Sequence, residues 1–233
     1  MHTISCLGFK GGAGRTTTAA ALAVGLVSIG QRVALIDAGY AVPLEEQLVI
    51  TGRGHGAVPD HSVLGRWAET AQNGSFCGGE LQYIRATTAP YLKVVLDQLW
   101  RENWAYAIVD TPAHQTASVF EAADRSSLLI APARNASDAR EIRDRLPDEF
   151  LIRQDRLRCL VAGAEQPQKV RAAFSPLSIL TTELPFESNF LGFIPHHNRN
   201  KSQSTSKDHW QRRCIQLADE VLELISERES MAS

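Results

Sequence analysis

Apolar residues occur along this chain in short continuous runs that alternate with longer helical patterns. The residues from Val33 to Ile36 form such a run, which is typical of a parallel strand covered on both faces. The stretch from Thr16 to Ile29 is apolar nearly all round and stops before Gly30, so it predicts a buried helix. This alternation predicts an α/β fold with a doubly wound, mostly parallel sheet and helices on both faces.

The same patterns predict further elements toward the C-terminus. Helices are expected at residues 91–102, 117–123, 137–146 and 207–228. Strands are expected at residues 106–109, 127–131, 157–162 and 178–181. Residues 51–61 are rich in glycine and residues 198–206 are polar, so both stretches are expected to be loops. With 233 residues and 44% hydrophobic content, the chain is expected to form one large domain over residues 1–233.

A glycine-rich segment precedes the first expected helix. Residues 10–18 read KGGAGRTTT and follow an apolar run at residues 4–9. Glycine allows backbone conformations in which several N–H groups converge on one anion, and the helix adds its positive N-terminal end. The residues expected to bind nucleotide phosphates here are Lys10, Gly11, Gly12, Ala13, Gly14, Arg15, Thr16 and Thr17. The alternative is a plain turn that joins a strand to a helix, but the order of strand, loop and helix favours phosphate binding.

This segment departs from the pattern G-x-x-x-x-G-K-[ST] at two positions. Phe9 stands where the first glycine is expected, and Arg15 stands where the lysine is expected. A guanidinium is wider than an ammonium and planar, so the exchange is not neutral in a cavity sized for a point charge. It can still bind phosphate oxygens in a bidentate manner. We therefore expect that nucleotide binding is kept more fully than catalysis.

Two aspartates follow expected strands and come to the edge of the sheet beside this loop. Asp110 ends the strand at 106–109 and is expected to contact Mg²⁺ through water, together with the hydroxyl of Thr16. Asp37 follows the strand at 33–36. The alternative for Asp110 is ordinary turn chemistry, because an aspartate before Thr-Pro often caps a turn.

The KGG-x-G start, with Lys10 five residues ahead of the usual lysine position, resembles the deviant Walker A motif of the ParA/MinD family of dimerising ATPases. RVALID at residues 32–37 resembles that family's second strand, and YAIVDTPA at residues 106–113 resembles its Walker B strand and switch. The best matches are the short forms without an N-terminal DNA-reading domain, including relatives that serve plasmid partition and T-DNA transfer. The resemblance implies a cytoplasmic P-loop NTPase with ATP and Mg²⁺ as ligands.

The resemblance also implies roles for individual residues. Lys10 would reach across a nucleotide-dependent homodimer to the partner's phosphates, although a lysine in a glycine loop is otherwise simply exposed. Lys10, Arg15 and Asp37 would form the catalytic set, and Asp37 would also lie near the metal. Pro195 would lie where the adenine is cradled.

One catalytic position of the family is altered in this chain. The second aspartate of its D-x-D-P segment, which activates the attacking water, falls on Gly39. Phosphoryl transfer depends on positioned charge and an oriented water, and Arg15 and Gly39 change both. Slow or absent hydrolysis is therefore predicted.

The formal net charge of −2 gives no global attraction to nucleic acid, so DNA binding would need a local patch. The candidates are Arg199, Lys201, Lys207, Arg212 and Arg213. A solvated surface is the alternative for one subunit, and a dimer would double the patch. The last expected helix carries many acidic residues, which oppose binding to anionic lipid, so no membrane partner is expected. Four scattered cysteines without a C-x-x-C pair indicate reduced thiols in a cytoplasm.

Three functions follow as hypotheses. The first is a ParA-like switch that positions or transfers DNA, with nonspecific DNA and a protein of ParB or relaxosome type as candidate partners. The second is a degenerate scaffold that no longer hydrolyses or binds nucleotide. The third is a family relative that regulates a secretion or polysaccharide complex.

Overall fold

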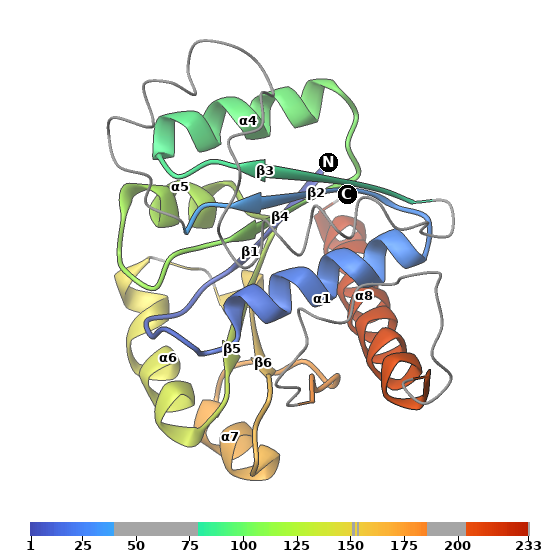
Figure 1. Cartoon of the computed structure of the whole chain (residues 1–233). Coiled ribbons are helices and arrows are strands. Elements are labelled where there is room, and N and C mark those ends of the chain that lie inside the picture. The colour runs from blue at the N-terminus through green and yellow to red at the C-terminus, as the bar shows by residue number, and fades with distance from the viewer. Residues whose placement is uncertain (40–78, 151, 153, 186–203, 233) are drawn as a thin grey trace.

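The computed structural model describes residues 1–39, 79–150, 152, 154–185 and 204–232. Within them, six strands form one sheet in the order β3-β2-β4-β1-β5-β6, and each neighbouring pair is parallel (Figure 1). The strands are β1 (His2–Cys6), β2 (Arg32–Asp37), β3 (Glu80–Arg85), β4 (Tyr106–Asp110), β5 (Leu128–Ala133) and β6 (Leu157–Val161). The helices are α1 (Arg15–Ser28), α4 (Ala89–Arg101), α5 (Ala117–Arg125), α6 (Ala136–Glu149), α7 (Pro167–Phe174) and α8 (Ser204–Ala232). The predicted doubly wound α/β fold is confirmed.

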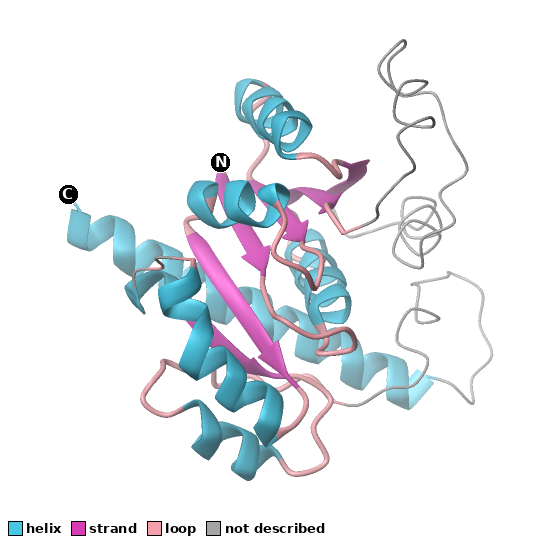
Figure 2. Cartoon of the chain, turned by 90° about the vertical axis from the view of Figure 1, so that its left-hand side faces the viewer, coloured by secondary structure: helices cyan, strands magenta, loops and turns pink. Residues whose placement is uncertain are grey.

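Helices cover both faces of the sheet, as Figure 2 shows. Helices α1 and α8 pack against one face, in a core that includes Ile4, Val33 and Ile108. Helices α4, α5, α6 and α7 lie over the other face, where Ile36 and Leu129 belong to two further cores. Successive side chains of a strand point to opposite faces, so strands covered on both sides are apolar throughout. This explains the continuous apolar runs in the sequence.

The close contact of α1 with α8 depends on Gly25. A Cβ at this position would lie 2.1 Å from the carbonyl oxygen of Cys214 and 2.9 Å from the Cβ of Ala218. Such distances are too short for any side chain, so the glycine allows the two helices to approach with their backbones. Helix α1, which begins at the phosphate loop, is thereby fixed between the sheet and α8.

Several predicted elements need correction. Strand β3 and helix α7 were not predicted. The strand expected at residues 178–181 is wrong, because this segment makes only an isolated parallel bridge from Ile179 to Cys159. The loop expected at residues 198–206 is wrong for its last three residues, because α8 begins at Ser204. The loop expected at residues 51–61 lies outside the described residues.

Two further expectations concern the cysteines and membrane binding. Cys6, Cys159 and Cys214 are free and buried, while Cys77 lies outside the described residues. None of the helices in the described part of the chain combines the length and the apolar composition needed to span a membrane.

The parallel topology brings the carboxyl ends of three strands together at one edge of the sheet. Cys6 at the end of β1 is in register with Asp110 at the end of β4, and Asp110 is in register with Asp37 at the end of β2. The glycine-rich loop follows β1 directly. In open parallel sheets, ligands bind in the crevice at this edge, so the fold places the loop and both aspartates at such a position.

Candidate functional site

The loop between β1 and α1 adopts conformations that require glycine. Gly12 has φ +78° and Gly14 has φ +99°. A Cβ at Gly14 would also lie 3.2 Å from the Cβ of Ala162, so a larger residue is strained there for two reasons. Gly14 is the N-cap of α1 and no side chain caps this end. The first N–H groups of α1 therefore remain available to an anion.

Thr16 and Asp110 meet directly beside this loop. The Thr16 hydroxyl donates to Oδ2 of Asp110 at 2.7 Å. Asp110 is only 5% exposed, and its buried Oδ1 has no hydrogen-bond partner among the described residues. Burial raises the pKa of Asp110 to about 7; the charge of Asp37 also raises it, while the Thr16 hydrogen bond and Arg15 lower it. A buried carboxylate with an unused oxygen and a neighbouring hydroxyl fits the oxygen ligands that Mg²⁺ requires.

Asp37 is buried at the end of β2 with both carboxylate oxygens oriented. Its Oδ1 accepts from the N–H of Gly39 at 2.9 Å, and its Oδ2 accepts from the Tyr83 hydroxyl at 3.1 Å. Asp37 therefore faces the site in a defined orientation, beside Asp110 on the neighbouring strand.

Gly39 has space for a side chain. A Cβ here would lie 3.5 Å from Oδ1 of Asp37 and 3.5 Å from the backbone nitrogen of Pro112. Both are ordinary van der Waals distances. Among the described residues, crowding therefore does not explain the missing carboxylate.

Arg15 folds back onto the loop. Its Nη1 donates to the carbonyl oxygen of Gly8 at 2.6 Å, and its side-chain carbons lie beside Gly8. Its Nε is buried and has no hydrogen-bond partner. Burial lowers the pKa of Arg15, while Asp110 and Cys6 act in the opposite direction. The guanidinium thus joins the two ends of the loop, and its contact with phosphate stays a prediction.

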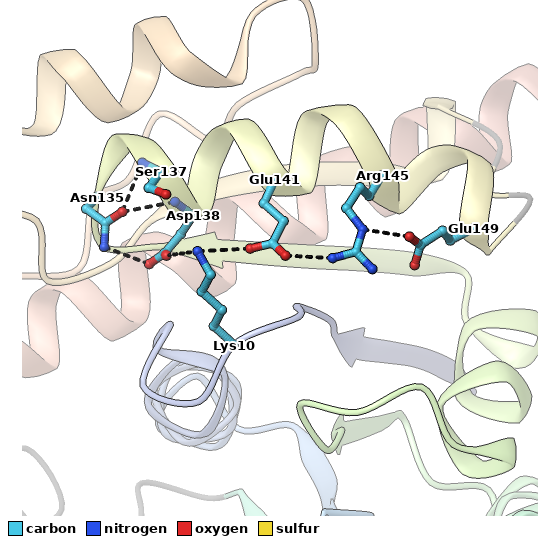
Figure 3. A network of polar contacts seen from close by, with 7 residues as sticks. All are labelled: Lys10, Asn135, Ser137, Asp138, Glu141, Arg145 and Glu149. Carbon is cyan, nitrogen blue, oxygen red and sulfur yellow. Dashed lines mark hydrogen bonds and ion pairs between the residues drawn. The ribbon is translucent and has the colours of Figure 1, made fainter.

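Lys10 pairs with helix α6 of its own chain (Figure 3). Its Nζ lies 3.0 Å from Oε2 of Glu141 and 3.4 Å from Oδ1 of Asp138. Its side chain is 47% exposed, so it is both accessible and paired. Nearby, Nη1 of Arg134 donates to the carbonyl oxygen of Gly12 at 3.3 Å. These contacts attach the outer part of the loop to the start of α6.

A cavity of about 200 Å³ opens beside the loop. It is lined by Gly12, Gly14, Arg15, Thr16, Thr17, Arg134, Ala162, Gly163 and Pro185. A larger hollow of about 570 Å³ adjoins it between the loop and the starts of α6 and α7. The structure thus brings most of the predicted phosphate-binding residues to one open cavity; Ala13 itself is buried in the loop.

The remaining predicted site residues are the candidates for adenine and DNA binding. Pro195, Arg199 and Lys201 lie outside the described residues, as does the side chain of Lys207. On α8, Arg212 is exposed, and Arg213 is half-buried with its Nη1 3.2 Å from Oε1 of Gln216.

Sequence reasoning missed four residues that contact this site. Tyr83 orients Asp37, Arg134 contacts the loop, and Asp138 with Glu141 binds Lys10. Tyr83 carried a signal in the alternation of Leu81 and Tyr83 on β3. The three others lie more than 100 residues from the loop and carried none.

These features together define a class of protein. A glycine loop joins the first strand to a buried helix, and a threonine hydroxyl meets a strand-terminal aspartate, on a doubly wound parallel sheet. This is the arrangement of a P-loop nucleotide-binding domain. The model of the CobQ/CobB/MinD/ParA nucleotide binding domain family matches residues 4–233, so the chain belongs to that family.

Individual relatives agree with this assignment. Protein VirC1 of Rhizobium radiobacter is 28% identical over 132 residues, which are 57% of this chain and 48% of VirC1. The match thus spans about half the length of that relative. Solved structures cover nearly the whole chain. MinD in the MinC:MinD cell division complex of Aquifex aeolicus has a TM-score of 0.65, with 19% identity and 96% of each chain covered.

Two further similar structures are complexes with a ligand. The septum site-determining protein MinD of Pyrococcus horikoshii, complexed with Mg-ADP, has a TM-score of 0.60, with 18% identity over 94% of this chain and 95% of that chain. The pNOB8 ParA bound to nonspecific DNA has a TM-score of 0.55, with 17% identity over 97% of this chain and 99% of that chain. At these identities the likeness concerns the fold.

Proposed function

We propose that this protein binds ATP with Mg²⁺ and acts as a nucleotide-dependent homodimeric switch in the partition, positioning or transfer of DNA, with weak or absent hydrolysis. The observation that carries the proposal is the contact between Thr16 and the buried Asp110 directly below the glycine loop. Oδ1 of Asp110 is buried beside this contact and has no hydrogen-bond partner within the described part of the chain. Leaving a buried carboxylate oxygen without a partner costs free energy, and this is expected where a cation binds.

In this proposal, different residues of the site would bind the phosphates and Mg²⁺. The main-chain N–H groups of residues 11–16 would hold the phosphates, because the loop and the start of α1 present them to one anion. Thr16, Asp37 and Asp110 would hold Mg²⁺, which supplies positive charge to the phosphates when bound. Arg15 would add a guanidinium once a phosphate competes with the carbonyl of Gly8.

Weak hydrolysis follows from two residues. Arg15 is engaged by the loop itself, and position 39 offers no carboxylate to orient a water. Removing one stabilising interaction from a transition state costs about 10²–10³-fold in rate. A switch that works by binding and exchange would still operate with such a site.

The proposed DNA role rests on relatives and on two adjacent arginines of α8. The structurally similar pNOB8 ParA was solved bound to nonspecific DNA, and VirC1 belongs to the relatives that match in sequence. In this chain, Arg212 and Arg213 are neighbours on α8. A homodimer would present two copies of this pair, which favours backbone contacts without sequence readout.

Calorimetry with ATP and a phosphate-release assay on the same samples test the proposal. The expected result is Mg²⁺-dependent ATP binding with little turnover, and loss of the Mg²⁺ dependence in Asp110→Ala. Asp124→Ala removes an exposed carboxylate on α5 and serves as the matched control. Rapid turnover by the wild-type protein would contradict the predicted weak hydrolysis.

A non-hydrolysing scaffold is the second candidate. The contact between Arg15 and Gly8 favours it, because this contact stabilises the loop without any ligand. The same calorimetry separates the two candidates: absence of ATP binding at millimolar concentration, with and without Mg²⁺, supports the scaffold.

A further inference from the structure

Two carboxylates on α6 are arranged to receive the ammonium of Lys10 (Figure 3). Oδ1 of Asp138 faces Lys10, while Oδ2 accepts from the Asn135 side chain at 2.9 Å. Oε2 of Glu141 faces Lys10, while Oε1 binds Arg145 at 2.6 Å. The side chains of Asp138 and Glu141 are only 11% and 22% exposed. Because both oxygens of each carboxylate have partners, the two groups are oriented as a pair toward one cation.

The contacts continue along α6 to the segment that follows Asp110. Nε of Arg145 lies 2.7 Å from Oε1 of Glu149, and the Glu149 carboxylate accepts from the side chain of Gln115. The guanidinium of Arg145 also lies over the ring of Phe9, 4.3 Å from its centroid. A continuous series of contacts therefore links the phosphate loop to residues 111–116, between β4 and α5.

We infer that Asp138 and Glu141 form an autoinhibitory latch, which holds Lys10 on its own chain and must release it before the lysine can reach the nucleotide of a second copy. The inference rests on the proposed dimeric switch, in which Lys10 crosses between copies. One ammonium cannot occupy both places, so the latch competes with dimerisation. Release removes one partner of Glu141, and the change passes through Arg145 and Glu149 to Gln115.

The ion pairs of the latch are weak enough to break and form again. Lys10 is about half exposed, and two ion pairs of this kind together shift an equilibrium by about three- to tenfold. The phosphates of a bound nucleotide carry more charge and outcompete two such pairs. Among the described residues, no atom lies within 4 Å of a Cβ added at Gly11 or Gly12, so this part of the structure leaves the loop room to move beside Lys10.

The first experiment tests the latch without nucleotide. Lys10 acylation by an N-hydroxysuccinimide ester is followed by peptide mass spectrometry and normalised to the exposed Lys93 on α4. The carboxylates raise the pKa of Lys10, so their removal exposes the amine and increases its reactivity. The double variant Asp138→Asn/Glu141→Gln is expected to react about three- to tenfold faster at Lys10. Asp144→Asn changes an exposed carboxylate that pairs with Arg143 on the same helix, and should match wild type. Equal rates in the double variant and wild type would overturn the inference.

The second experiment tests competition with dimerisation. Analytical ultracentrifugation with saturating ATP and Mg²⁺ is expected to give a dimer dissociation constant about three- to tenfold lower in the double variant. Hydrogen exchange in residues 111–116 of the nucleotide-free double variant should rise. If Lys10 reacts faster but ATP-dependent dimerisation is unchanged or weaker, the latch role is wrong. Calorimetry on the same samples distinguishes failure of the two proposals. If the wild-type protein does not bind ATP, the proposed function is wrong. The acylation rates still decide whether α6 holds Lys10.

Discussion

The two sides of the phosphate loop differ in how completely they retain a nucleotide site. On one side, Thr16 and the buried Asp110 are in contact, and one Asp110 oxygen has no partner in the part of the chain that the structure describes. On the other side, Arg15 is bound to the loop's own Gly8 carbonyl, and Gly39 lacks any functional group. In the proposed function, the first side would serve binding and the second would serve bond cleavage. If the proposed function holds, binding and hydrolysis would depend on separate residues here and could change independently.

Restoring the second side should have the largest effect. Position 39 has space for a side chain, so Gly39→Asp combined with Arg15→Lys supplies both missing groups without crowding. We expect ATP turnover to rise by about 10²–10³-fold, measured as phosphate release at saturating ATP. The matched control is Gly39→Asn with Arg15→Lys, which has the same size but no carboxylate, and should gain much less. If the Asp variant binds ATP normally and turns over no faster, the assignment of position 39 is wrong.

Among changes that affect the first side, substitution of Gly14 should lower ATP affinity the most. Gly14→Ala places a Cβ on a residue with φ +99° and 3.2 Å from the Cβ of Ala162. A left-handed conformation costs a residue with a side chain about 1–2 kcal/mol, so ATP affinity should fall by roughly 10-fold or more in calorimetry. Gly30→Ala is the control, because it also places a Cβ on a residue with positive φ (+85°) but lies beyond the far end of α1. Equal losses in the two variants would show that loop geometry is not what limits binding.

The metal side can also be tested through the pH dependence of stability. The pKa of Asp110 is about 7 in the folded protein and lies near 4 in an unfolded chain. Between these values the folded state holds the extra proton, so the free energy of unfolding falls as pH rises from about 4 to 7. Asp110→Asn stays neutral and should be more stable than wild type at pH 8 by roughly 1–4 kcal/mol, with no advantage below pH 4.

Thermal unfolding at both pH values, with and without Mg²⁺ and ATP, checks this expectation. Ligands should stabilise wild type and reverse the order of the two proteins at pH 8, because binding to the folded state alone raises stability. An Asp110→Asn variant that is less stable than wild type at pH 8 without ligands would contradict the burial argument. Asp124→Asn, an exposed carboxylate on α5, should show neither effect.

Local sequence patterns predicted the structural features that lie within single segments of the chain. The glycine loop, α1 and the ends of β2 and β4 follow from short runs of residues, because strand, loop and helix there have strong individual signals. Strand β3 was missed because it is a half-buried edge strand: Leu81 and Tyr83 pack against the core of α1 and α8, and Ile84 packs against the core on the other face. Helix α7 was also missed, although Val170, Ala173 and Phe174 have a helical spacing.

The polar contacts of the site were harder to predict for a physical reason. The partners of Lys10 lie 128 and 131 positions away along the chain, as the numbers of Asp138 and Glu141 show. Many charged residues on α6 have the same chemistry, and only the packing of α6 beside the loop selects two of them. The same applies to Arg15, whose contact with Gly8 depends on the fold of the loop. Pairings of this kind are properties of tertiary structure.

The smallest expected effect concerns DNA binding by α8, whose arginines belong to neither side of the loop. Arg213→Ala removes one positive charge from α8, where Arg212 is its neighbour. Removing one interaction with a DNA phosphate should lower the salt slope of binding by about one and weaken binding about two- to fivefold at low salt. Arg101→Ala removes the same charge from the exposed end of α4 and controls for net charge. Fluorescence anisotropy with arbitrary duplex DNA, with ATP and Mg²⁺ present, measures both quantities. If the two variants lose affinity equally, the effect comes from overall charge, and the patch on α8 does not contact DNA.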